Sequence, residues 1–288
     1  MPFRSSFAGL LPVLLSLSAC FLIPAPAEVH DTFANCLQFF LNGKPPTLLL
    51  PRVNSASICQ RYKNLYRFAT LYDRDKRIPI YSAYKYGKGG EGRPDIWFVE
   101  PQLARNIQKP GSNMERENSQ DIARVFEHIR ASQAVSDDYN TDKTIDRGHL
   151  NPNNHQSDRD SRTATFTLTN IVPMLSGLNR GSWRIYEKKA GEKAEQCDET
   201  YFVAGAVPGN NYISGGRVNR PSHIWSAGCC VRHNRGLCSW GALASNDEKN
   251  ATGMDLKSLE AQLEKRYKSK VDLFNSGCYQ ECETTIQL

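Results

Sequence analysis

Alternating hydrophobic and polar positions predict several β-strands in the first third of the chain. The segments FATLYD (68–73) and IPIYSAYKY (78–86) are rich in β-branched and aromatic residues, and the charged positions between them predict a turn. The segment KGGEGRPD (88–95) is typical of a flexible loop, and DIWFVEP (95–101) then predicts a short strand. The first two strands therefore predict a hairpin.

Hydrophobic residues at helical spacing occur in three segments. SQDIARVFEHIRAS (119–132) and DLKSLEAQLEKRYKS (255–269) each place their apolar residues on one side of a helix. SGLNRGSWRIYEKKAG (176–191) predicts a helix that ends near Gly191. Three helices are therefore expected.

The remaining hydrophobic segments predict further strands. IDRGHL (145–150) and TATFTLTN (163–170) are expected to be two strands joined by a polar loop, because threonine alternates with apolar residues in the second. TYFVAGAV (200–207), SHIWSAGCCV (222–231) and CSWGALAS (238–245) predict three more, the last two linked by a turn. Clusters of strands with helices between them favour an α+β fold over a doubly wound sheet.

The first 27 residues have the pattern of a secretory signal peptide. Arg4 precedes an apolar run from Phe7 to Ile23, and a small-residue cleavage site ends at Ala27. An uncleaved membrane anchor is the alternative, but Pro12 interrupts the run. We therefore expect a protein that is secreted to the extracellular space without a membrane contact after cleavage, with residues 28–288 as a single domain.

The cysteines favour the same compartment. The sequence has nine, and Cys20 lies in the expected signal peptide, so an even number remains. An even count in an exported chain predicts disulfides. We expect Cys36 to pair with Cys59, and the adjacent Cys229 and Cys230 to pair with different partners. A zinc site is the alternative, but the spacing contains no paired C-x2-C units.

Composition and charge narrow the function only slightly. Hydrophobic residues make up 40% of the 288-residue chain and charged residues 23%, which is ordinary for a globular protein. The formal net charge of +6 favours polyanionic partners mildly. From charge alone, a slightly basic soluble protein is the better interpretation.

The segment from 144 to 189 contains residues suited to phosphodiester hydrolysis. His149 follows Asp-Arg-Gly, and the next helix is expected to place Asn179 and Glu187 on one side. A neutral histidine can take a proton from water near pH 7. Mg²⁺ prefers oxygen ligands and can neutralise charge on the phosphate, and a nearby arginine can bind phosphate through its forked donors.

These residues resemble the DNA/RNA non-specific endonuclease family, which has the ββα-metal (His-Me finger) fold. The family pattern is D-R-G-H, then a strand end N-x-x-P, then N-x-x-x-W-x-x-x-E, and all three parts occur here in order as DRGH, NIVP and NRGSWRIYE. The resemblance covers residues 60–280, and the sequence is most similar to the vertebrate secreted branch of the family. It implies a central, mostly antiparallel sheet flanked by helices, stabilised here by disulfides.

The resemblance also implies roles for individual residues. His149 matches the general base, and Asn179 matches the protein ligand of a Mg²⁺ ion, for which Mn²⁺ or another divalent cation could substitute. Glu187 matches the carboxylate that holds the waters of the metal. Asn170 matches a supporting amide near the histidine. Trp183 is expected to pack in the core.

The arginines are assigned less directly. Arg147 and Asp146 match the first positions of the motif and are expected to orient its loop. Arg93 is the best match for the arginine that stabilises phosphate charge, although its spacing to Glu100-Pro101 is longer than the usual family pattern.

The resemblance implies a secreted Mg²⁺-dependent endonuclease that cleaves DNA and RNA through contacts with the phosphate backbone. Cleavage without sequence preference needs backbone contacts rather than readout of base edges. Two alternatives remain open: a secreted nucleic-acid-binding protein that has lost catalysis on the same fold, and a hydrolase of another phosphate ester.

Overall fold

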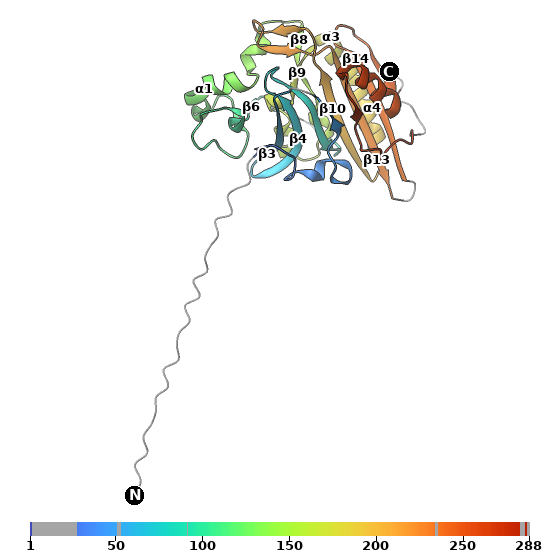
Figure 1. Cartoon of the computed structure of the whole chain (residues 1–288), viewed down its shortest axis with the longest axis horizontal. Helices are drawn as coiled ribbons and strands as arrows, with labels where there is room; N and C mark the ends of the chain where they lie inside the picture. Colours follow the sequence, from blue (N-terminus) through green and yellow to red (C-terminus); the bar gives the residue numbers. More distant parts are fainter. Residues whose placement is uncertain (2–27, 51–52, 91, 234–235, 283–285, 287–288) are drawn as a thin grey trace.

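The computed structural model describes residues 1, 28–50, 53–90, 92–233, 236–282 and 286 (Figure 1). The expected signal peptide therefore lies outside the described residues, apart from Met1. In the described part of the chain, an eight-stranded sheet has the order β1 (Val29–His30), β3 (Ser55–Tyr62), β4 (Leu65–Asp73), β5 (Ile78–Lys85), β10 (Glu199–Val207), β13 (His223–Arg232), β14 (Gly236–Ser245), β15 (Ala251–Met254). Every neighbouring pair in this sheet is antiparallel.

Helices and short strand pairs surround the main sheet. The described α-helices are α1 (Gln120–Ser132), α2 (Arg159–Ala164), α3 (Ser176–Asn179), α4 (Ser182–Ala194) and α5 (Leu256–Tyr267). The two-stranded sheets are β8 (Ile145–His149) with β9 (Ile171–Leu175), β6 (Phe98–Val99) with β7 (Glu115–Arg116), β11 (Asn211–Ile213) with β12 (Val218–Arg220), and β2 (Thr47–Leu48) with β16 (Val271–Asp272). The α+β fold with a mostly antiparallel central sheet is confirmed.

Both faces of the main sheet are buried, which explains the nearly unbroken apolar sequence of its central strands. On β10, Phe202 belongs to the hydrophobic cluster that includes Trp183 of α4, whereas Val203 belongs to the cluster that includes Leu259 of α5. Successive side chains of a strand point to opposite faces, so one strand supplies both clusters. Trp183 is therefore a core residue, as predicted.

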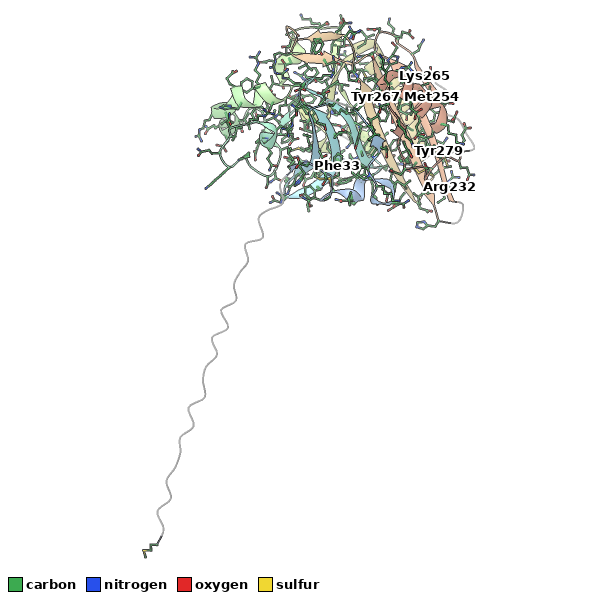
Figure 2. The ribbon with its side chains drawn as sticks, in the orientation of Figure 1. Phe33, Arg232, Met254, Lys265, Tyr267 and Tyr279 are labelled. Carbon is green, nitrogen blue, oxygen red and sulfur yellow. A yellow bond between two sulfur atoms is a disulfide. The ribbon has the colours of Figure 1, made fainter. Side chains whose placement is uncertain are left out.

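Helix α5 is attached to its face of the sheet by polar contacts as well as apolar ones. Figure 2 labels Tyr267, the last residue of this helix. Its hydroxyl accepts a hydrogen bond from Trp225 Nε1 at 3.0 Å and donates one to the Ala206 carbonyl at 2.9 Å. Asp255 caps the start of the helix by accepting from Ser258 N at 2.9 Å. The predicted helix over 255–269 is thus confirmed as Leu256–Tyr267.

Two of the predicted elements are wrong in detail. The segment 163–170 is not a strand: it contains the end of α2 and a 3-10 turn over Leu168–Asn170, and the strand begins only at Ile171. The helix predicted over 176–191 is divided into α3 and α4. A Cβ atom on Gly181, at the break, would lie 2.4 Å from the Gly177 carbonyl oxygen, so this close approach requires glycine.

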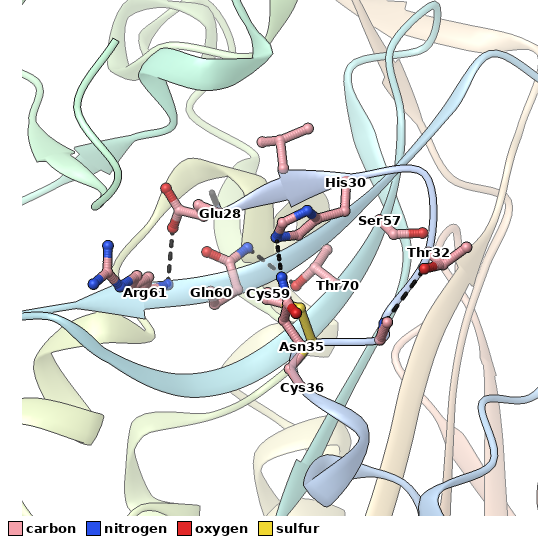
Figure 3. Close-up of a disulfide and its surroundings, with 12 residues drawn as sticks. Glu28, His30, Thr32, Asn35, Cys36, Ser57, Cys59, Gln60, Arg61 and Thr70 are labelled. Atoms are coloured by element: carbon pink, nitrogen blue, oxygen red, sulfur yellow. Dashed lines mark hydrogen bonds between the residues drawn. A yellow bond between two sulfur atoms is a disulfide. The ribbon is translucent and has the colours of Figure 1, made fainter. Parts of the chain in front are cut away.

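Four disulfides connect the described cysteines. The prediction that Cys36 pairs with Cys59 is confirmed (Figure 3), and so is the prediction of separate partners for Cys229 and Cys230. The pairs are Cys36–Cys59, Cys197–Cys230, Cys229–Cys278 and Cys238–Cys282. Their sequence separations run from 23 to 49 residues. Restriction of the unfolded chain by a loop of this size stabilises the fold by roughly 3–4 kcal/mol per bridge.

A pair of fully buried acids lies beneath β1. Glu28 Oε1 accepts a hydrogen bond from Arg61 N at 2.8 Å (Figure 3), and Glu100 Oε1 accepts one from Thr167 Oγ1 at 2.6 Å. The second oxygen of each carboxyl receives no N–H or O–H donor from the described residues, and the two carboxyl groups face each other. We expect the two carboxyl groups to share a proton, which would satisfy both. Burial raises the pKa of both groups, and for Glu28 the charge of Glu100 raises it further.

Replacing Glu100 with glutamine is expected to make the stability of the protein less sensitive to alkaline pH. Because the folded-state pKa values are raised, the contribution of the pair is fully present below the ordinary carboxyl pKa and is lost as the pH rises through the raised values. The amide would donate to Glu28 without needing a shared proton. Thermal unfolding across a pH series would measure this: about 1 kcal/mol shifts the midpoint by roughly 2–4 °C at this size.

The matched control for this experiment is Glu127→Gln, at an exposed carboxyl on α1. The unfolding midpoint of this control should depend on pH in the same way as that of the unmodified protein. A Glu100→Gln protein that loses stability with rising pH as steeply as the unmodified chain would show that no proton is shared by the pair.

Candidate active site

The two strands of the motif form a hairpin-like pair that leads into two short helices. In β8 and β9, which run antiparallel, His149 pairs with Ile171 and Gly148 with Val172. Figure 1 shows this pair and α3 together at the top of the molecule. A Cβ atom on Gly148 would lie 2.7 Å from Met174 Cβ, so the glycine lets the strands approach closely. The sequence DRGH therefore ends in a histidine at the last position of a strand.

His149 is half-buried between two aromatic rings. Its ring centroid lies 4.8 Å from that of Phe166, edge-on, and 5.9 Å from that of Trp97. Burial, and to a smaller extent the positive charge of Arg93, lower the pKa of His149 to about 3. A hydrogen bond with the Arg147 backbone raises the pKa but does not offset these effects. Since Nε2 has no partner among the described residues, Nδ1 makes that bond. The imidazole is therefore neutral near pH 7, and its Nε2 is buried without a hydrogen-bond partner among the described residues.

Asn170 holds the chain that follows His149. Its side chain is fully buried, accepts from Asn151 N at 3.0 Å and donates to the Asn151 carbonyl at 3.0 Å. It also accepts from Ser82 Oγ at 2.8 Å and donates to the Thr165 carbonyl at 2.9 Å. All four positions of the amide are used. Asn170 is thus a positioning residue that fixes the loop after His149, and it does not line the cleft that His149 faces.

Asn179, at the end of α3, is oriented by Asp146. Its Nδ2 donates to Asp146 Oδ2 at 3.0 Å, so Oδ1 is the acceptor that remains for another group. Arg180 binds the same carboxylate with two donors, Nε at 2.7 Å and Nη2 at 2.6 Å. Burial alone would raise the pKa of Asp146, but hydrogen bonds from Arg180, Asn179 and Ser176 outweigh it and hold the pKa below its usual range.

Glu187 projects from α4 into the same region. Burial raises the pKa of Glu187 to about 8, although a hydrogen bond with Trp183 opposes the shift. The backbone of this turn is held by His155, whose Nε2 lies 2.9 Å from the Glu187 carbonyl and whose Nδ1 lies 3.0 Å from the Tyr84 hydroxyl. His155 is therefore structural. A carboxyl buried without a cation nearby is an environment that a bound cation would stabilise in its charged form.

Four arginines border the site. The Arg93 guanidinium lies 5.5 Å from the Phe166 ring centroid, and that of Arg147 lies 5.1 Å from the Trp97 centroid. Arg147 Nη2 also donates to the Ser136 carbonyl at 2.8 Å. Arg180 and Arg184, on the α3–α4 segment, complete the set. The positive charge is thus presented by several separate segments.

These side chains surround one cleft of about 550 Å³. Its described lining residues are Arg93, Arg147, His149, Pro152, Asn153, Asn154, Phe166, Asn179, Arg180, Arg184 and Glu187. A base, an amide oxygen, a carboxyl group and several guanidinium groups therefore face the same space. This set of groups suits hydrolysis of an anionic ester.

The family was determined by comparison with known proteins. Residues 46–275 match the family described as DNA/RNA non-specific endonuclease. The chain belongs to this family.

Two relatives agree with the family match. The Homo sapiens protein named "Endonuclease domain-containing 1 protein" is 35% identical over 211 residues, which cover 71% of this chain and 40% of the human one. The Mus musculus protein of the same name is 31% identical over 280 residues, covering 95% of this chain and 52% of the mouse one. The chain thus spans about half or less of the length of these relatives. Their names confirm the resemblance to the vertebrate branch.

A solved structure supports the fold. A chain in "Crystal structure of the EndoG/EndoGI complex: Mechanism of EndoG inhibition" superposes with a TM-score of 0.52 at 16% sequence identity, covering 76% of this chain and 89% of that chain. With the β8–β9 pair followed by α3 and α4, this similarity shows the ββα-metal fold predicted from the motif.

The structure brings together five of the six site residues that the family motif predicts. Arg93, Arg147, His149, Asn179 and Glu187 all line the cleft, whereas Asn170 supports it from the core. Arg180 and Arg184 also line the cleft, although neither is predicted as a site residue from the sequence. Arg180 directly follows the predicted metal ligand, and Arg184 is one helical turn before Glu187, so their positions in NRGSWRIYE were the available signal.

The cleft suits a hard divalent cation that keeps most of its water. Among the described residues, no group of three or more His, Cys, Asp or Glu side chains could hold a metal ion. Asn179 Oδ1 and the Glu187 carboxyl group are two oxygen donors of the motif that line the cleft. Mg²⁺ accepts oxygen ligands and is usually bound through one or two protein groups with several waters. The donor set therefore fits the family's divalent cation.

Proposed function

We propose that this protein is a divalent-metal-dependent endonuclease that hydrolyses phosphodiester bonds of DNA and RNA with little sequence preference. The observation that carries the proposal is a neutral His149 with an unpartnered Nε2, facing the same cleft as Asn179, Glu187 and the arginines. Family membership supports the nuclease activity. Mg²⁺ is the preferred cation, and Mn²⁺ can substitute for it.

In the proposed reaction, His149 Nε2 accepts a proton from the water that attacks phosphorus. The hydrogen bond from Nδ1 to the Arg147 backbone holds the ring in the tautomer that leaves Nε2 free. Arg93 lies close enough to His149 to lower its pKa, so it can bind a phosphate oxygen beside the attacking water.

Asn179 and Glu187 would hold the metal, Asn179 through Oδ1 and Glu187 through the bound waters. When bound, the cation supplies positive charge that stabilises the pentacovalent phosphate and the leaving oxygen. The role of Asp146 is to keep the Asn179 oxygen directed into the cleft through the bond at 3.0 Å. Arg180 keeps Asp146 ionised for this purpose.

We also propose that the protein acts outside the cell. Four disulfides form among the described cysteines, and this density is typical of an oxidising compartment. In the described part of the chain, no helix has the length and hydrophobicity needed to cross a membrane.

Degradation of plasmid DNA and of a long RNA by protein collected from the medium of transfected animal cells tests both proposals. Cleavage is expected with Mg²⁺ and is expected to fall to background with EDTA, then to return when Mg²⁺ is restored. Protein that stays in the cells would contradict secretion. Protein that binds nucleic acid but leaves it intact with every divalent metal would instead support the inactive binding protein.

A further inference from the structure

A second cavity, of about 610 Å³, adjoins the cleft, and both are lined by Arg93. We call it the Arg116 cavity, and the charged residues that define it are Lys63, Arg93, Asp95, Arg116, Arg159, Asp160 and Arg162. Apart from Arg93, none of these residues is one of the predicted site residues. Most of them come from the β3–β4 turn, β7 and α2. Three distant segments therefore place basic side chains around one space.

The positive charge of the Arg116 cavity is not neutralised internally. Asp160 is already paired, with Lys63 Nζ at 2.8 Å and Arg67 Nη2 at 3.8 Å. Asp95 is the other acid among the described lining residues, and it faces four arginines. Like charges gathered in this way repel one another unless an anion is shared between them.

Two of these arginines have side chains without a partner. Arg116 and Arg159 are exposed, and neither guanidinium makes a hydrogen bond or an ion pair in the described ranges. Arg162 is anchored, because its Nη1 donates to the Ser157 carbonyl at 2.8 Å, but a carbonyl does not neutralise its charge. Guanidinium groups in this state match phosphate oxygens in charge and in donor geometry.

A third cavity, which also shares Arg93 with the cleft, differs. It has a volume of about 400 Å³ and is lined by Asp146, Arg147 and Arg180 together with Arg93 and Asn179. Arg180 is bound by both donors to Asp146, and Arg147 donates to the Ser136 carbonyl and to Asn140 Oδ1. Apart from Arg93, which lines both cavities, the described arginines of this cavity are already engaged. Of the two cavities, the Arg116 cavity therefore has more available positive charge.

We propose that the Arg116 cavity is a second phosphate-binding subsite, which holds the nucleic acid strand beyond the reacting phosphate, next to Arg116 and Arg159. The proposal rests on the proposed nuclease function. The shared Arg93 connects the two cavities, so the ligand that fits both is a linear polyanion rather than a single free phosphate. The nucleic acid is therefore expected to make additional phosphate contacts on the Arg116 side of the scissile bond.

The test uses the double variant Arg116→Glu/Arg159→Glu and a control with the same charge change, Lys257→Glu/Lys265→Glu. The control residues lie on α5, which packs against the other face of the sheet. Binding of a fluorescein-labelled single-stranded 20-mer is measured by anisotropy in EDTA over a range of salt concentrations, so no turnover is needed. Hydrolysis of bis(p-nitrophenyl) phosphate with Mg²⁺ reports the reacting centre alone, because this substrate is too small to span both cavities.

The double variant is expected to bind the 20-mer at least about 10-fold more weakly than the control, and to lower the slope of log Kd against log salt by about 1–2, as for two lost phosphate contacts. Hydrolysis of the small ester should be unchanged. Arg116→Gln/Arg159→Gln provides a milder variant, and equal thermal midpoints exclude misfolding.

Two results would overturn the subsite: a double variant that binds the 20-mer as the control does, or one that weakens binding of a mononucleotide as much as of the 20-mer. The second result would mean a site for free anions. Failure of the unmodified protein to hydrolyse either substrate would contradict the nuclease function instead, while the binding experiment in EDTA would still decide whether the subsite exists.

Discussion

Replacing His149 with alanine is expected to reduce cleavage of DNA and RNA by at least about 10²-fold, on the scale of a lost general base. The reason is structural: Nε2 is the unpartnered base in the cleft, and burial with the charge of Arg93 keeps the ring neutral. A cation bound nearby would act in the same direction as Arg93. The loss should appear in kcat, measured on a fluorescent oligonucleotide under saturating Mg²⁺.

The control for this change is His128→Ala, at an exposed position on α1 outside the cleft. It should cleave at the rate of the unmodified protein. Imidazole added to the His149→Ala protein should restore part of the rate, because the vacated space lies between Phe166 and Trp97 and can admit a free base. Activity of His149→Ala equal to that of the unmodified protein would exclude His149 as the base.

Replacing Asn179 with alanine is expected to cause a loss of comparable size, about 10²-fold or more, because it removes the amide oxygen that the structure directs into the cleft. The Mg²⁺ concentration needed for half-maximal rate should rise at the same time. Asp146→Asn is expected to cost less, about 10-fold, since it loosens the orientation of Asn179 without removing the oxygen. A Mg²⁺ titration of each variant, with the initial rate as readout, would measure both effects.

Asn211→Ala serves as the matched control, since Asn211 is exposed on β11 and does not line the cleft. Its rate and metal dependence should match those of the unmodified protein. If Asn179→Ala required no more Mg²⁺ than the control, Asn179 would not be a metal ligand, and its bond to Asp146 would have a structural purpose only.

The sequence alone was sufficient to predict that His149, Asn179 and Glu187 lie together in one site. This succeeded because a strand pair followed by a helix has few possible arrangements, and the motif residues lie at the end of the first strand and on the following helical segment. The hydrophobic spacing also predicted β4, β5, β10, β13, β14, α1 and α5, where both faces or one clear stripe are buried.

The threonine-rich segment was misread because its hydroxyl groups are not on a solvated face. Thr167 and Thr169 donate to the buried Glu100 carboxyl at 2.6 Å and 3.1 Å, so their alternation with apolar residues reflects a buried polar network. The start of α2 is instead fixed by Asp158, which accepts from Asp160 N at 3.0 Å and from Ser161 N at 2.9 Å.

Charges that meet only in the folded chain could not be predicted from spacing. Arg180 pairs with Asp146 across 34 positions, and Arg116 and Arg159 reach one cavity from separate elements. Long-range electrostatics of this kind depend on the complete topology. Helix α3 likewise ends early because of the close contact at Gly181, which periodicity does not show.

The disulfide between Cys197 and Cys230 has a consequence for how the cleft could fail. Cys197 lies just beyond α4, the helix that carries Glu187, and Cys230 lies on β13, so a covalent bond ties the far end of this helix to the sheet. The histidine half of the cleft is held without covalent bonds, by the Asn170 amide. Reduction of this bridge would therefore release the far end of α4 from the sheet, while the loop after His149 would keep the hydrogen bonds of Asn170.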